Sequence, residues 1–220
     1  LWRGLARLAE TSRSGVARDE LKFDKIPFQL YHNNMQKLNL FDVQQALNNL
    51  GREVFFHEDL IAGFGANKRA VEAFLSYNYR TGKIQRVRHG MYFFTGASVD
   101  PFFLANTIYT PSYISLETAL SFYGIIPEVV YTVTSITTKA TREFVFNGIN
   151  YSYQSIKMEA FTGYVPIDKD NKKVFMATPE KALADYYYFL SLGKRTVNDR
   201  IDTSKINKKL FKEYLSLFKR

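Results

Sequence analysis

Residues 56–94, FHEDLIAGFGANKRAVEAFLSYNYRTGKIQRVRHGMYFF, constrain the fold more than any other stretch of this sequence. Glu58 and Asp59 suit the positive end of a short helix, and the glycines on either side of Phe64 allow the left-handed backbone of a tight turn. A longer helix is predicted from near Asn67, because apolar residues recur on one of its faces, at Val71, Phe74 and Leu75. The segment therefore predicts a short helix, a turn and a longer, half-buried helix.

The first turn of the longer helix carries two cations, Lys68 and Arg69. Cations at this end oppose the helix dipole at a cost of roughly 0.3 to 1 kcal/mol each. A bound phosphate would reverse the sign of that interaction, whereas a solvated helix end would need no ligand. Because residues that break a local rule are enriched at functional sites, this pair is a candidate for anion contact.

A basic hairpin follows the longer helix. Residues 83–87 and 91–94 have strand-like composition, and the His-Gly pair between them can adopt the positive φ of a tight turn. Arg86 and Arg88 are therefore expected at or near the tip of the hairpin, where guanidinium groups could contact a nucleic-acid backbone.

This order of elements is typical of a winged helix-turn-helix, so we predict a domain that binds double-stranded DNA. A winged helix that makes only protein contacts, in an interaction adaptor, remains the alternative. The residues expected to contact DNA are Asn67, Lys68, Arg69, Arg80, Lys83, Arg86, Arg88 and His89.

Composition excludes several classes of site. The chain has no cysteine, and its three histidines are well separated, so we expect no disulfide, no metal site and no cofactor. Its apolar runs are far shorter than the roughly 20 residues of a membrane span, and nothing resembles a signal peptide, so we expect a cytoplasmic protein without membrane contact. The net charge of +9 favours a polyanionic or acidic partner.

We expect three segments: a poorly interpretable N-terminal arm over residues 1–38, the winged helix over 39–97, and a second domain over 98–220. Within the winged helix, LNLFDVQQALNNL predicts a first helix ending before Gly51. The stripe expected to be buried in this helix is formed by Phe41, Val43, Ala46 and Leu50.

The second domain is expected to be an antiparallel sheet flanked by helices, which makes the chain an α+β protein. Ser115 and Thr178 are predicted helix caps. Strands are expected over residues 129–138 and on both sides of Asn147-Gly148, which is a strong hairpin signal. A further hairpin is expected to turn near residues 168–171.

A last helix is expected from about Ser204 and divides into an apolar and a basic side. Its lysines would fall at i, i+3, i+4 and i+7, which concentrates like charge on one stripe. DNA phosphate, RNA bound by a neighbouring protein or an acidic protein surface could offset the repulsion, and a solvated basic face is the simpler interpretation. The lysines of this candidate partner face are Lys205, Lys208, Lys209 and Lys212.

After a segment ending in RHGMYFF, the chain contains the segments SYISLETALSFYGIIPE, TSITTKATREFVFNGINYSY and VFMATPEKALADYYYFL. In this order, the segments resemble the AbiEi-type antitoxins of type IV toxin-antitoxin systems. The resemblance covers roughly residues 40–192. It implies a bacterial regulator that binds the promoter of its own operon and counteracts a nucleotidyltransferase-like toxin, without implying direct toxin contact. Two copies could assemble on an inverted repeat. The family's DNA-contacting region corresponds here to Lys68, Arg69, Arg86 and Arg88, and His89 stands where the family usually has Arg.

An enzyme is the less favoured alternative, and we expect no catalytic residue. Asp168 and Asp170 do not fit a calcium-binding loop, because Gly is missing at its sixth position and Pro179 stands at its twelfth. Asp170-Asn171-Lys172 matches half of a metal-dependent nuclease signature, which Glu143 or Glu159 could complete. A polar turn explains the same residues more simply.

Overall fold

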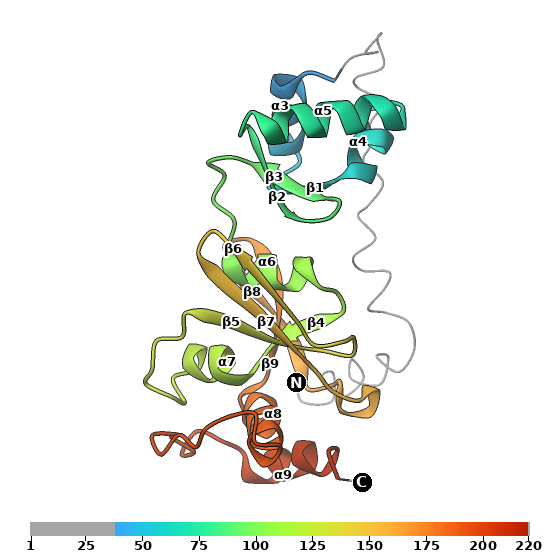
Figure 1. Ribbon diagram of the computed structural model, residues 1–220. Coiled ribbons are helices and arrows are strands. Elements are labelled where there is room, and N and C mark those ends of the chain that lie inside the picture. Colours follow the sequence, from blue (N-terminus) through green and yellow to red (C-terminus); the bar gives the residue numbers. More distant parts are fainter. Residues whose placement is uncertain (1–37, 220) are drawn as a thin grey trace, which may run out of the picture. The chain divides into compact units, whose positions relative to one another are not determined.

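The computed structural model describes residues 38–219, which form seven α-helices and two β-sheets (Figure 1). The predicted N-terminal arm, except for its last residue, lies outside the described residues. The chain divides into two compact units between Val99 and Asp100. None of the helices in the described part is long and apolar enough to cross a membrane.

The described part of the first unit, residues 38–99, contains three helices and a three-stranded antiparallel sheet with the strand order β1-β3-β2. Strand β1 was not predicted, and it pairs with the outer side of the predicted hairpin. The elements are α3 (Leu40–Asn49), β1 (Val54–Phe56), α4 (His57–Phe64), α5 (Lys68–Arg80), β2 (Ile84–Arg88) and β3 (Met91–Phe94).

Local signals explain how the two central helices begin and end. Asp59 accepts a hydrogen bond from the Phe56 backbone N–H at 2.7 Å, which satisfies a free donor at the start of α4. Gly65 ends α4 with φ +59°, the left-handed conformation expected there. Asn67 then caps α5 by accepting from the N–H of Ala70 at 2.9 Å.

The core of the first unit contains apolar side chains from α3, α4 and α5. Val43, Leu60 and Val71 are fully buried, one from each helix, and Phe55 of β1 packs against the Phe94 ring with centroids 5.1 Å apart. The predicted stripe of α3 was partly wrong. Val43 and Ala46 are buried with Leu47, whereas Phe41 (68% exposed) and Leu50 (40%) are not.

The second unit contains a six-stranded sheet with the order β6-β7-β5-β4-β9-β8. Its elements are α6 (Pro101–Ile108), β4 (Ser112–Ile114), α7 (Leu116–Phe122), β5 (Thr132–Thr137), β6 (Arg142–Phe146), β7 (Ile149–Ser155), the short 3₁₀ helix η2 (Met158–Ala160), β8 (Tyr164–Lys169), β9 (Lys172–Ala177), α8 (Pro179–Ser191) and α9 (Lys208–Ser216).

The prediction of an antiparallel sheet in the second unit was wrong, because the sheet is mixed. Strands β5 and β7 run parallel, as do β4 and β9, while the two hairpins β6-β7 and β8-β9 are antiparallel. Antiparallel hairpins are visible in the sequence through their turn residues, Asn147-Gly148 and Asp170-Asn171, all of which have positive φ. Parallel pairs join strands that are distant in sequence and carry no comparable local signal.

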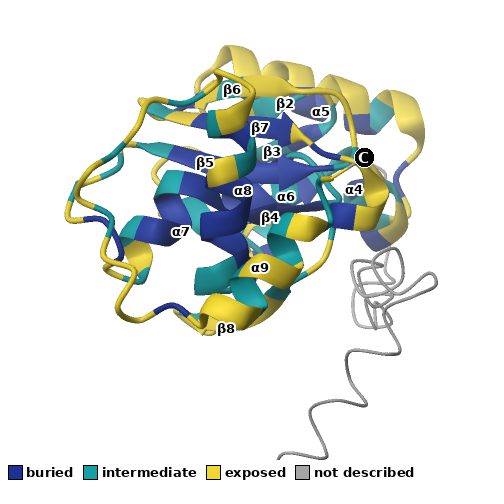
Figure 2. Ribbon diagram, turned by 90° about the horizontal axis from the view of Figure 1, so that it is seen from below, coloured by how far each residue is buried: buried dark blue, intermediate teal, exposed yellow. Residues whose placement is uncertain are grey.

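Helices cover both faces of this sheet. On one face, Tyr153 of β7 donates a hydrogen bond to the Ala105 carbonyl of α6 at 2.6 Å. On the other face, Tyr113 of β4 reaches Asp185 of α8. Figure 2 shows the buried sides of α7 and α8 toward the sheet and exposed residues on α9. Helix α9 forms an outer layer, and its Phe211 ring packs on Tyr187 of α8 with centroids 5.8 Å apart.

The packing of α9 leaves no room for a side chain at residue 163. Gly163 has φ +77°, and a Cβ built on it would lie 2.7 Å from the ring of Tyr214 in α9. We expect Gly163→Ala to lower the free energy of unfolding by about 2 to 4 kcal/mol, because backbone strain and overpacking add. Gly148→Ala is the matched control, since φ is +74° there but nothing lies within 4 Å. Equal losses in urea unfolding of the two variants would contradict the close approach of α9.

Candidate functional site

A groove in the first unit brings together the start of α4, one face of α5 and the tip of the β2-β3 hairpin. Its volume is about 640 Å³. Four of the eight residues predicted to contact DNA line it, namely Lys68, Arg86, Arg88 and His89. The other lining residues are Phe56, His57, Glu58, Glu72, Leu75, Ser76, Tyr79, Gly90 and Tyr92. We call this feature the α5 groove.

Helix α5 contributes a stripe of residues at helical spacing to the groove. Lys68, Glu72, Ser76 and Tyr79 follow one another along this face. Lys68 Nζ lies 3.9 Å from the Glu72 carboxylate in an exposed pair, whose contribution to stability is expected to be below about 1 kcal/mol. Because the pair is weak, a phosphate could displace Glu72 from Lys68 at little cost.

The hairpin contributes two arginines, each held over an aromatic ring. The Arg86 guanidinium lies 5.3 Å from the Tyr79 ring centroid, and that of Arg88 lies 5.9 Å from the Phe56 ring centroid. Arg88 also donates a hydrogen bond to the His89 carbonyl at 3.3 Å. Stacking on aromatic rings orients a guanidinium without using all of its five donors. Both arginines therefore remain able to bind an anion.

The groove is less one-sided in charge than the sequence analysis assumed. Its three cations, Lys68, Arg86 and Arg88, stand against the carboxylates of Glu58 and Glu72. The two carboxylates reduce the attraction of the groove for phosphate. Tyr79, His57 and the two glutamates were not predicted as site residues, because their place in the groove depends on how α4, α5 and the hairpin pack together.

The remaining predicted residues lie outside the lining of this groove. Asn67 uses its side-chain oxygen to cap α5. Arg69 and Arg80 are exposed at the first and last turns of α5, and Lys83 is exposed immediately before β2. Arg69 lies one residue after Lys68, about 100° further around the helix.

Comparison with models of known protein families and with curated proteins finds no match to this chain.

The predicted lysine stripe at the C-terminal end was partly wrong. Helix α9 begins at Lys208 after the cap Asn207, so Lys205 precedes the helix. Lys205 Nζ instead lies near Gly124 at the end of α7. Lys208 and Lys212 still share a face of α9, and both are exposed together with Lys209.

The residues of the nuclease alternative are not brought together. Glu143 lies on edge strand β6, Asp170 lies in the β8-β9 turn at the other end of the strand order, and Glu159 lies in η2. Within residues 38–219, no group of three or more His, Asp or Glu residues could hold a metal ion.

A buried ion pair between Lys181 and Asp185 lies close to Ser115, one of the two residues that were predicted to be helix caps. Thr178 does cap α8, but the hydroxyl of Ser115 makes no cap and donates instead to Asp185 Oδ2 at 2.7 Å. Asp185 also accepts from Tyr113 at 3.0 Å and pairs with Lys181. Burial raises the pKa of Asp185 and lowers that of Lys181, because each charged form loses hydration.

Proposed function

We propose that the first unit is a winged helix-turn-helix that binds double-stranded DNA. In this proposal α4 and α5 form the helix-turn-helix, α5 enters the major groove, and the β2-β3 hairpin lies over the backbone. The observation that supports it most is that Lys68, Arg86 and Arg88, from two separate elements, line one groove. Their guanidinium and ammonium groups would neutralise phosphates.

We further propose that the chain is a transcriptional regulator of the antitoxin type. The support is the resemblance described above, together with the order of α3, α4, α5 and the basic hairpin. The chain would repress its own operon and counteract a nucleotidyltransferase-like toxin, and the resemblance does not imply direct contact with that toxin. An interaction adaptor is the competing proposal, and the carboxylates of Glu58 and Glu72 in the groove are the feature that favours it.

The proposal predicts that Lys68→Ala combined with Arg69→Ala weakens binding to the chain's own upstream DNA by about tenfold or more, because two phosphate-directed cations are lost. Gel-shift titration measures this affinity. The fold should persist, since both side chains are exposed and neither contributes to the core.

Lys208→Ala with Lys209→Ala is the matched control. These lysines also occupy the first two positions of a helix after an asparagine cap, so the change in charge and the local context are the same. Equal weakening by both pairs would show that the cations at the start of α5 have no special part in binding. Absence of any shift with the unmodified chain would favour the adaptor.

A further inference from the structure

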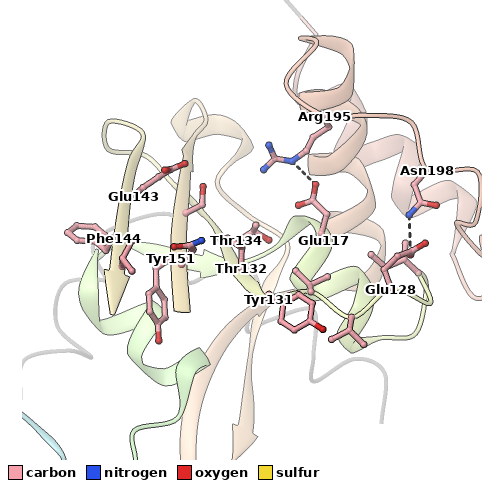
Figure 3. A pocket seen from close by; sticks show the side chains of 16 residues that line it. Glu117, Glu128, Tyr131, Thr132, Thr134, Glu143, Phe144, Tyr151, Arg195 and Asn198 are labelled. Atoms are coloured by element: carbon pink, nitrogen blue, oxygen red, sulfur yellow. Dashed lines mark hydrogen bonds and ion pairs between the residues drawn. The ribbon is translucent and has the colours of Figure 1, made fainter. Parts of the chain in front are cut away.

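The second unit has a cavity of about 610 Å³ on the open part of its sheet face (Figure 3). Its floor is formed by β5, β6 and β7, and its walls come from α7 and from the segments around residues 126–131 and 195–198. Small-molecule sites usually have volumes of about 300 to 1,000 Å³. The cavity is therefore large enough for a small organic ligand.

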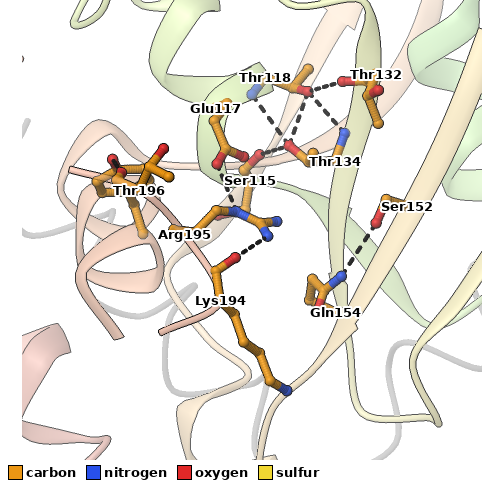
Figure 4. Close-up of polar contacts among 11 residues, drawn as sticks. Ser115, Glu117, Thr118, Thr132, Thr134, Ser152, Gln154, Lys194, Arg195 and Thr196 are labelled. Atoms are coloured by element: carbon orange, nitrogen blue, oxygen red, sulfur yellow. Dashed lines mark hydrogen bonds and ion pairs between the residues drawn. The ribbon is translucent and has the colours of Figure 1, made fainter. Parts of the chain in front are cut away.

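The floor of the cavity is polar and held by a hydrogen-bond network (Figure 4). Thr134 donates to the Ser115 carbonyl at 2.7 Å and accepts from the Thr118 N–H at 3.2 Å. Ser152 accepts from Gln154 at 3.3 Å. Because these contacts fix the side chains, the floor needs little reorganisation to receive a ligand.

Three glutamates line the cavity, and two of them are already neutralised. Glu117 pairs with Arg195 at 2.6 Å, and Arg195 is further held by the Lys194 carbonyl at 2.8 Å. Glu128 pairs with Arg200 at 3.3 Å. Glu143, from β6, is the one of the three that has no ion-pair partner among residues 38–219. The lining thus retains a negative charge in a chain whose net charge is +9.

Exposed apolar side chains also line the cavity. Tyr131 is 86% exposed, Val129 75% and Val145 70%, and all three line the cavity. Val145 lies on the same face of β6 as Glu143, two residues along the strand. A cavity lined by an unpaired carboxylate, an aromatic ring and aliphatic groups is suited to a cation that carries an apolar body.

We propose that this cavity binds a small organic cation, with its guanidinium or ammonium group at Glu143 and its hydrocarbon part against Tyr131 and Val145. Asn150 and Ser152, opposite β6 on β7, offer oxygen atoms to the remaining donors of the cation. The site lies within the second unit, so it stands independently of DNA binding by the α5 groove.

Butylguanidinium and butylurea form a suitable pair of probes, because they match in shape and differ in charge. Each is titrated to about 10 mM into the isotopically labelled chain, with amide NMR shifts as the readout. We expect saturable shifts around residues 131, 143 and 152 with butylguanidinium and at least about fivefold weaker binding of butylurea.

Binding measurements on four variants test whether butylguanidinium occupies this cavity. Glu143→Gln and Tyr131→Ala should each weaken butylguanidinium binding by about fivefold. Glu159→Gln, at an exposed carboxylate outside the cavity, and Tyr77→Ala, at an exposed tyrosine of the first unit, should leave it unchanged. Absence of saturable shifts, equal binding of butylurea, or equal effects of the control variants would each overturn the proposal.

Discussion

Replacing Asp185 with alanine is expected to lower the free energy of unfolding of the second unit by about 3 to 5 kcal/mol, the usual cost of breaking a buried ion pair. Both Asp185 and Lys181 are fully buried. Without its partner, the ammonium group of Lys181 would still lie near the ring of Phe218, 4.7 Å from its centroid, and near that of Tyr113. The hydroxyls of Tyr113 and Ser115 would lose their acceptor as well.

Native-state hydrogen exchange of α8 amides measures this loss within the second unit. The double replacement Lys181→Met with Asp185→Leu should cost less than Asp185→Ala, because no charge is then left buried without a partner. Glu72→Ala, which breaks the exposed pair with Lys68 in the first unit, should change the stability measured by exchange of α5 amides by less than about 1 kcal/mol. A loss for Asp185→Ala as small as that for Glu72→Ala would contradict the expected contribution of the Lys181–Asp185 pair to stability.

Replacing Arg86 and Arg88 together with alanine is expected to weaken binding to the upstream DNA by about a hundredfold. The slope of log affinity against log salt concentration should become shallower by about 2, because two phosphate contacts are lost. Both guanidinium groups line the α5 groove and are oriented by aromatic rings. Because neither arginine belongs to the core of the unit, the variant should keep its fold.

Lys139→Ala with Arg142→Ala is a close control for the arginine pair. It removes the same charge, and both cations lie near the Tyr109 ring in the second unit, at 5.4 and 5.7 Å from its centroid. Fluorescence anisotropy at several salt concentrations compares the variants. If the control weakens binding as much as Arg86→Ala with Arg88→Ala, the cations of the hairpin have no special part in DNA contact.

The elements that could be predicted correctly are those whose sequence signal is local. The Gly65 turn, the Asn67 cap and the β2-β3 hairpin follow from residues within a few positions of one another. Strand β1 was missed because its three residues carry no periodicity of their own, and it becomes a strand by pairing with β3. The central strand β4 was missed for the same reason.

The functional features that were missed depend on contacts between distant residues. Asp185 and Lys181 are four residues apart, but Tyr113 and Ser115, which complete their network, lie about seventy positions earlier. The cavity joins Glu143 of β6 to Arg195, which follows α8. No periodicity or turn motif relates such residues, so neither site could be predicted from the sequence.

Salt-dependent binding of the unmodified chain to its own upstream DNA tests the central claim most directly. If about four cations of the first unit contact phosphates, the affinity should fall by about a hundredfold between about 50 and 200 mM salt. An unrelated duplex of equal length should bind more weakly at every salt concentration. Affinity that does not change with salt, or no binding at the lowest salt concentration, would contradict the assignment of the α5 groove to DNA.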